Sequence, residues 1–153
     1  MPEQMILDET IVAASFWLAT DESEPFQISP TTAVPLEPWL AHLERGLSPS
    51  DLGVILEGDS NLEALKQHHA DIPLIALHLP KFTDGRIYSH ARRLRTLWGY
   101  QGTLLVFGDV LRDQLLYLKR CGINAFYMRE DQDLKASLAA FSLYTEHYQY
   151  SER

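Results

Sequence analysis

The sequence predicts an α/β protein in which about five consecutive βα units form a parallel sheet covered by helices. Two observations lead to this fold class. Short, nearly continuous apolar runs recur along the chain, and a segment with helical apolar spacing follows each of them. Continuous apolar runs are typical of strands buried on both faces, and strands that alternate with helices pair in parallel through right-handed crossovers.

The N-terminal part differs from the rest of the chain. Residues 1–30 are expected to form an extension, in which TIVAASFWLAT (10–20) predicts a strand or hairpin because it is rich in β-branched and aromatic residues. Residues 33–147 are expected to hold the βα units. The first unit is AVPL (33–36) followed by the helix EPWLAHLERG, with Pro38 near the first helical position and Gly46 after the last.

The other four units follow in order. Strands are predicted at GVILEGD (53–59), IPLIALHL (72–79), TLLVF (103–107) and INAFYM (123–128), and a helix is predicted at NLEALKQHHA (61–70). The helix after residue 86 aligns Ile87, Ala91, Leu94 and Trp98 and ends at Gly99; the next aligns Leu111, Leu115 and Leu118 and ends at Gly122; the last begins near Gln132.

These units fit two sheet arrangements. They form either an open doubly wound sheet or part of a (β/α) barrel, since a complete eightfold barrel needs about 250 residues. A chain of 153 residues with 46% hydrophobic content is expected to form one domain, residues 1–153.

Composition excludes several functions. No apolar run is long enough to cross a membrane and the N-terminus is acidic, so we expect a cytoplasmic protein. The lone Cys121 excludes an internal disulfide and any multi-cysteine cluster within one chain, and it is expected to be a buried thiol. A net charge of −8 argues against nucleic-acid binding.

The charge is unevenly distributed. Residues 80–120 carry +5, so the remainder of the chain carries −13. Such polarity favours either an anionic ligand or an oriented protein partner, and the alternative is an ordinary solvated helix face.

The loop PKFTDGR (80–86) is the candidate binding site. Functional groups of parallel sheets gather where strands end and helices begin. Lys81 and Arg86 flank the Asp84-Gly85 turn in front of a helix, so a small anion would meet cationic side chains, backbone donors and the helix dipole. Arg112 would reach the same pocket if its strand is adjacent. In the alternative, Asp84 caps its own helix and leaves Arg86 paired and exposed.

Metal and cofactor signals are weak. Asp59, Asp84 and Asp109 each follow a predicted strand and could gather around Mg²⁺, but helix capping explains all three, so no metal site is predicted. The histidines have no metal-binding spacing, and the common nucleotide and hydrolase motifs are missing. The sequence therefore identifies no cofactor.

Residues 75–131 closely resemble a bacterial family catalogued as domain of unknown function 934. The resemblance rests on PKFTDGR (80–86), ARRLR (91–95), GDVLRDQ (108–114) and RCGINAF (120–126). Leu79 stands where the family usually has phenylalanine. The resemblance implies an oxidoreductase label and an association with assimilatory sulfite reduction, and it supplies no catalytic residues.

Three classes of function fit these observations. The first is a small enzyme or redox component that binds an anion such as sulfite; its site residues would be Lys81, Asp84, Gly85, Arg86, Arg93, Asp109 and Arg112. The second is a non-catalytic accessory that docks on sulfite reductase through its arginine-rich helix. The third is a scaffold that forms a homodimer over exposed sheet edges, through Trp17, Trp39 or the tail tyrosines Tyr144, Tyr148 and Tyr150.

Overall fold

A computed structural model describes residues 2–21 and 23–141 as an α/β fold built on one mixed, mostly parallel eight-stranded sheet. The strands are β1 (Gln4–Leu7), β2 (Thr10–Ala13), β3 (Trp17–Leu18), β4 (Thr32–Pro35), β5 (Gly53–Leu56), β6 (Leu74–Leu79), β7 (Thr103–Gly108) and β8 (Ala125–Phe126). The α-helices are α1 (Leu36–Glu44), α2 (Arg86–Arg92) and α3 (Leu115–Arg120), and residues 134–141 are also helical.

The strand order decides between the two predicted arrangements. It runs β2-β1-β8-β7-β6-β5-β4-β3, and each of β4 to β8 pairs in parallel with the strand before it in the chain. A doubly wound sheet would reverse direction partway, so this uninterrupted order corresponds to the partial barrel. The five predicted strands follow in order, and a helix follows four of them, whereas β5 and β6 are connected by short 3₁₀ turns.

The N-terminal extension contains the predicted hairpin, but in a different place. β1 pairs antiparallel with both β2 and β8, and Asp8 and Glu9 turn the chain with positive φ angles of 50° and 63°. Two such residues are typical of the tight turn that matches the twist of a hairpin. The segment 10–20 is therefore not one strand: its first part closes the hairpin and its second part, β3, begins the parallel run.

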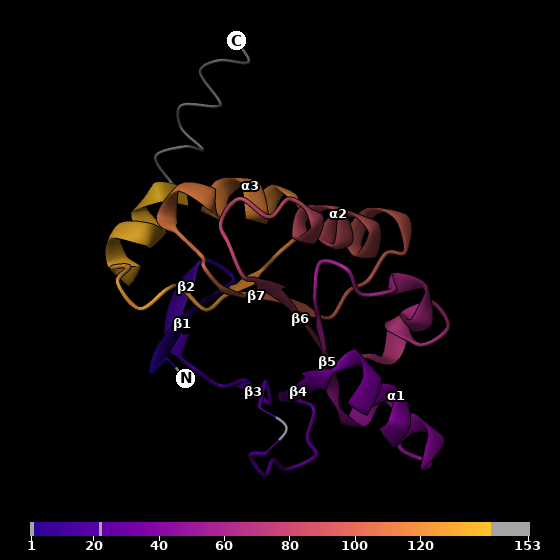
Figure 1. The fold of residues 1–153 in the computed structure, drawn as a ribbon. Coiled ribbons are helices and arrows are strands. Elements are labelled where there is room, and N and C mark those ends of the chain that lie inside the picture. The colour runs from indigo at the N-terminus through magenta and orange to yellow at the C-terminus, as the bar shows by residue number, and fades with distance from the viewer. Residues whose placement is uncertain (1, 22, 142–153) are drawn as a thin grey trace.

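The sheet curls into a half-barrel (Figure 1). Its two edge strands, β2 and β3, are consecutive in the chain and are joined only by residues 14–16. Four Cα–Cα steps span at most about 15 Å, whereas seven strand spacings in a flat sheet would separate the edges by about 34 Å. The short connection is therefore possible only because the sheet bends its edges toward each other.

Each face of the sheet has its own core. The helices cover the convex face, where the larger apolar cluster includes Trp39, Leu77, Leu94 and Phe126. The concave face holds a smaller cluster with several small side chains: Met5, Phe16, Leu18, Ala33, Ile55, Leu74, Ala76, Leu105, Ala125 and Tyr127. Alternate residues of each strand thus face opposite cores.

Several local predictions need correction. Residues 61–70 do not form one helix; they form short 3₁₀ turns at Leu62–Leu65 and His69–Asp71. α2 continues as a π-helical turn, Arg93–Leu97, before it ends at the predicted Gly99. Trp39, predicted as a dimer contact, is buried, and its indole N–H donates to the Leu52 carbonyl. The tail tyrosines lie outside the described residues.

Candidate functional site

Four side chains mark the mouth of the half-barrel, at the carboxyl ends of its strands. Glu57, His78, Phe107 and Tyr127 each stand two positions beyond a concave-face residue, respectively Ile55, Ala76, Leu105 and Ala125. Because strand side chains alternate, they continue the inward-facing rows. His78 and Phe107 are also direct partners in the β6–β7 ladder. The mouth is therefore built by strand register.

Glu57 and His78 form a hydrogen-bonded pair at this mouth. The Nδ1 atom of His78 lies 2.7 Å from Oε1 of Glu57, and the imidazole stacks on the Phe107 ring with 4.9 Å between centroids. The His78 side chain is 32% exposed, so a ligand can reach it. A carboxylate on one ring nitrogen fixes the tautomer and orientation of an imidazole and leaves Nε2 for other partners.

The backbone that carries Glu57 is held from two sides. The Glu57 N–H donates to Oγ of Ser60 at 2.8 Å, and Nε2 of His90 donates to the carbonyls of Glu57 and Gly58 at 3.1 and 3.0 Å. His90 belongs to α2, and the burial of its side chain lowers its pKa. A lower pKa favours the neutral imidazole, which can donate through Nε2. The Glu57 carboxylate is thus presented by a fixed loop.

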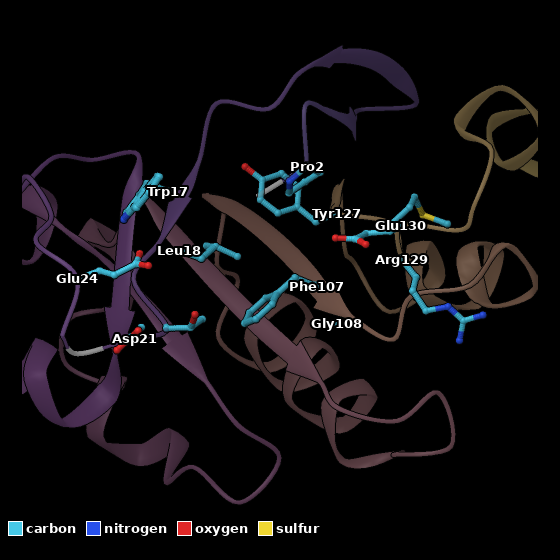
Figure 2. Close-up of a pocket in the computed structure, with 12 residues that line it drawn as sticks. Pro2, Trp17, Leu18, Asp21, Glu24, Phe107, Gly108, Tyr127, Arg129 and Glu130 are labelled. Carbon is cyan, nitrogen blue, oxygen red and sulfur yellow. The ribbon is translucent and has the colours of Figure 1, made fainter.

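A cavity of about 640 Å³ lies on the concave side of the half-barrel (Figure 2), and neither Glu57 nor His78 lines it. Its lining comes from β3 on one side and from β7 and the residues after β8 on the other. β3 is not a neighbour of β7 or β8 in the sheet. Phe107 belongs to its wall and also stacks on His78, which connects the pair to the cavity. The lining residues are Pro2, Trp17, Leu18, Thr20, Asp21, Glu24, Phe107, Gly108, Tyr127, Met128, Arg129 and Glu130.

Tyr127 ties this wall to the connection between the sheet edges. Its hydroxyl accepts a hydrogen bond from the Phe16 N–H at 2.9 Å and donates one to the Phe16 carbonyl at 2.5 Å. Burial raises the pKa of Tyr127, which favours the protonated hydroxyl that this donor role requires. Tyr127 therefore contributes its ring to the cavity, because its hydroxyl is already engaged.

Arg129 is the one cationic residue of the lining, and its charge is compensated. Its guanidinium donates to Asp109 and Asp131, each at 2.7 Å, and neither aspartate lines the cavity. These contacts lower the pKa of Asp131 to about 2. In Figure 2 the Arg129 side chain turns away from the cavity centre. The cavity consequently has an acidic rim.

The predicted anion loop 80–86 is largely bonded to itself and its neighbours. Asp84 accepts hydrogen bonds of 3.1 Å from the Arg86 backbone and guanidinium, which lowers the pKa of Asp84. The Phe82 N–H donates to Asp109, and the Asp84 N–H donates to the Lys81 carbonyl. Arg86 is thus paired and exposed, as in the alternative, but the N-cap of α2 is Gly85 and has no side-chain cap. Anion binding at Lys81, Gly85 and Arg86 stays a prediction.

The structure brings Asp109 to this loop but places Arg112 elsewhere. Asp109 joins the loop to Arg129, and the pKa of its carboxyl is lowered by that guanidinium. The Arg112 backbone N–H donates to Gln132, and Arg112 lines a separate cavity of about 330 Å³ with Asp131 and Asp133 among its walls. A common pocket for Arg86 and Arg112 is therefore not among the described cavities.

The arginines after this loop have intramolecular partners. Arg92 donates to the Tyr117 hydroxyl at 2.6 Å, and Arg93 donates to Glu63 at 2.7 Å. Arg95 is half-buried and donates to three backbone carbonyls, those of Tyr100, Gly102 and Gly122. Arg95 is therefore a structural residue, and the basic run does not form one open cationic surface.

Other candidate chemistry finds no site in the part of the chain that the structure describes. No three histidine, cysteine, aspartate or glutamate side chains there are grouped as metal ligands, and Cys121 is buried at the end of α3. No helix in that part is long and apolar enough to cross a bilayer.

Fold and site together define a small α/β half-barrel protein with a ligand-sized cavity at the carboxyl edge of its strands. A family model described as a bacterial protein of unknown function (DUF934) matches residues 53–153, so the chain belongs to that family, as the resemblance predicted. The match begins at β5 and includes the Glu57–His78 pair. No curated protein and no solved structure matches the chain.

Proposed function

We propose that the protein binds a small molecule at the mouth of the half-barrel and that His78, oriented by Glu57, exchanges a proton with it. The observation that carries this proposal is the 2.7 Å contact between the two side chains, placed against a wall residue of the large cavity. Sheets of consecutive βα units present their catalytic groups at this edge, which supports the same location.

The chemistry of the pair supports proton transfer. An imidazole with one ring nitrogen bonded to a carboxylate keeps its other nitrogen for proton exchange, so Nε2 of His78 is the atom that would meet the ligand. Glu57 would act as the positioning residue and His78 as the group that meets the ligand. This division of roles predicts different consequences for the two variants.

The test is a thermal-shift panel on the wild type and on matched variants. The compounds are sulfite, sulfate, phosphate, flavins, nicotinamide nucleotides and Mg²⁺ at constant ionic strength. A ligand at about 100 times its dissociation constant adds roughly 2.7 kcal/mol, which raises the midpoint of such a domain by several degrees. His78→Gln should abolish the shift and Glu57→Gln should reduce it, whereas Glu63→Gln, on a comparably exposed glutamate, should keep it. Equal shifts in all four proteins would make the pair structural.

We further place the protein beside assimilatory sulfite reduction, with a small oxyanion attracted to the loop 80–86. Family resemblance supports the pathway, and the 61% exposed Arg86 side chain, in the same loop as Lys81, supports the anion. Sulfite should then shift the wild type but not Arg86→Ala, while Arg45→Ala, an exposed arginine after α1, should respond as the wild type does. Loss of the shift in both variants would indicate a general charge effect.

A non-catalytic accessory of sulfite reductase is the second candidate function. Phe82 and Tyr117 are 51% and 45% exposed, and the Arg92 guanidinium lies 5.3 Å from the Tyr117 ring centroid. Exposed aromatic side chains beside arginine are typical of protein interfaces. In sedimentation with sulfite reductase, a complex that weakens with salt and is lost in Arg92→Glu, but survives in Asp84→Asn, would favour docking. No complex at low salt would exclude this role.

A further inference from the structure

We infer that the cavity at the mouth of the half-barrel binds a small organic cation through its aromatic walls and acidic rim. The inference rests on the proposed function, since it names the ligand class of the same site. Its volume of about 640 Å³ lies within the range of small-molecule sites in proteins.

Aromatic side chains enclose the cavity from opposite sides. Trp17 approaches from β3, and Phe107 and Tyr127 approach from β7 and the end of β8. Trp17 is 41% exposed, whereas tryptophan side chains are on average highly buried. A ligand bound in the cavity would cover this exposed ring. The faces of such rings attract ammonium and guanidinium groups, and tryptophan attracts them most strongly.

The charges of the lining add to this preference. Asp21, Glu24 and Glu130 line the cavity together with one cation, Arg129, whose guanidinium is bound by two aspartates outside the lining. Glu24 and Glu130 form no ion pair within residues 2–21 and 23–141, and Figure 2 shows their carboxylates on opposite sides of the cavity.

An anion is the least compatible ligand for this surface. It would meet the acidic rim and would have to compete with Asp109 and Asp131 for Arg129. A neutral ligand would gain only contact with the aromatic walls, whereas a cation gains that contact and the attraction of the rim. The net charge of −8 also raises the local concentration of cations around the whole molecule.

The experiment compares ligands of the same shape and different charge. Choline and its neutral isostere 3,3-dimethylbutan-1-ol, with n-butylammonium and n-butylguanidinium, are titrated into the full chain. The readout is the indole N–H resonance of Trp17 in an NMR spectrum, assigned with Trp17→Phe. We expect at least one cation to shift this resonance and choline to bind about tenfold more tightly than the isostere. Glu24→Gln/Glu130→Gln should remove that difference, and the control Glu63→Gln should keep it.

Several outcomes would overturn the inference. In the first, the neutral isostere binds as tightly as choline. In the second, the affinity difference between choline and the isostere is unchanged in the double variant. In the third, none of the cations shifts the Trp17 resonance. Adding His78→Gln separates the two proposals. If a neutral or anionic compound binds here only when His78 is present, the proposed function stands and the cation inference fails. If choline binds the wild type and His78→Gln equally, the cation site stands and His78 is not the group that meets the ligand.

Discussion

The convex side of the half-barrel and its concave mouth use charged residues in opposite ways. On the convex side, Arg93 pairs with Glu63 and Arg95 binds backbone carbonyls. These arginines of the basic run thus make contacts within the fold. At the mouth, Glu24 and Glu130 form no described ion pair, and the Glu57–His78 pair is accessible. In this protein, the charges that cluster along the sequence belong to the scaffold, whereas the residues of the candidate site are brought together by strand register.

The largest expected effect is a difference in the free energy of unfolding between alanine variants of two glycines, one at the cavity and one in the loop 80–86. Gly108 lines the cavity with a φ of 108°, and a Cβ there would lie 2.3 Å from the Leu79 carbonyl oxygen. Gly85, in the convex-side loop, has a φ of −78° and open space around it. Gly108→Ala should lower the free energy of unfolding by about 4 kcal/mol, and Gly85→Ala by no more than about 0.5 kcal/mol. Urea unfolding measures both. Equal effects would contradict the described backbone.

The second prediction concerns Arg95, the half-buried arginine of the convex side. Arg95→Ala should cost about 3 kcal/mol, because it leaves the carbonyls of Tyr100, Gly102 and Gly122 without their donor. Arg92→Ala is the matched control, since it removes one contact at an exposed hydroxyl. Thermal unfolding at matched pH measures the difference. Similar midpoints for the two variants would show that the Arg95 contacts do not stabilise the fold.

The third prediction tests the wall of the mouth by pH. Tyr127→Phe should cost about 2 kcal/mol because the Phe16 N–H and carbonyl lose their partner. Tyrosines of the unfolded chain ionise near about pH 10, and burial raises the pKa of Tyr127 in the folded state. Its contribution is therefore complete below about pH 10 and is lost as the pH rises through the folded-state value.

Urea unfolding between about pH 8 and about pH 11 should show this loss of stability. Tyr127→Phe should flatten the alkaline slope without abolishing it, because burial also raises the pKa of Tyr100. An unchanged slope in Tyr127→Phe would mean that this hydroxyl titrates as freely in the folded state as in the unfolded chain.

The smallest expected effect is that of the exposed ion pair on the convex side. Arg93 and Glu63 are 41% and 54% exposed, so a double-mutant cycle with alanine at both positions should give a coupling energy below about 1 kcal/mol. The same cycle at 1 M salt should give less, since salt screens exposed pairs. A coupling energy of several kcal/mol would contradict the expectation that this exposed ion pair stabilises the fold less than the contacts of the half-buried Arg95.

Local signals predicted most of the fold. The apolar runs and helix-ending glycines gave the strands β4 to β8 and four of the helices that follow them in order, because they depend on residues close in sequence. The sequence left the choice between an open sheet and a partial barrel undecided, because the curl depends on two edge strands meeting through residues 14–16. The partner of Arg93 lies thirty residues away, so its ion pair leaves no local trace.

The candidate site predicted from the sequence, on the loop 80–86, stays a prediction, and the Glu57–His78 pair and the cavity lie at the same edge of the sheet on other residues. The spacing of His78 from the other histidines matches no metal motif, so spacing along the chain does not indicate a role for it. Counting alternate positions from Ala76 would have placed it on the concave face, one strand from Glu57. That signal becomes usable only when the concave face is known, which itself requires the curl.

The connection through residues 14–16 also bears on self-association. Open sheet edges are where strands from another molecule add, and such edges invite aggregation. Here the edges are short, with four residues in β2 and two in β3, and they are consecutive in the chain. The connection and the two contacts of Tyr127 with Phe16 hold one end of the gap between these edges closed. The covalent continuity of its two edges therefore limits how far the half-barrel can open at this end.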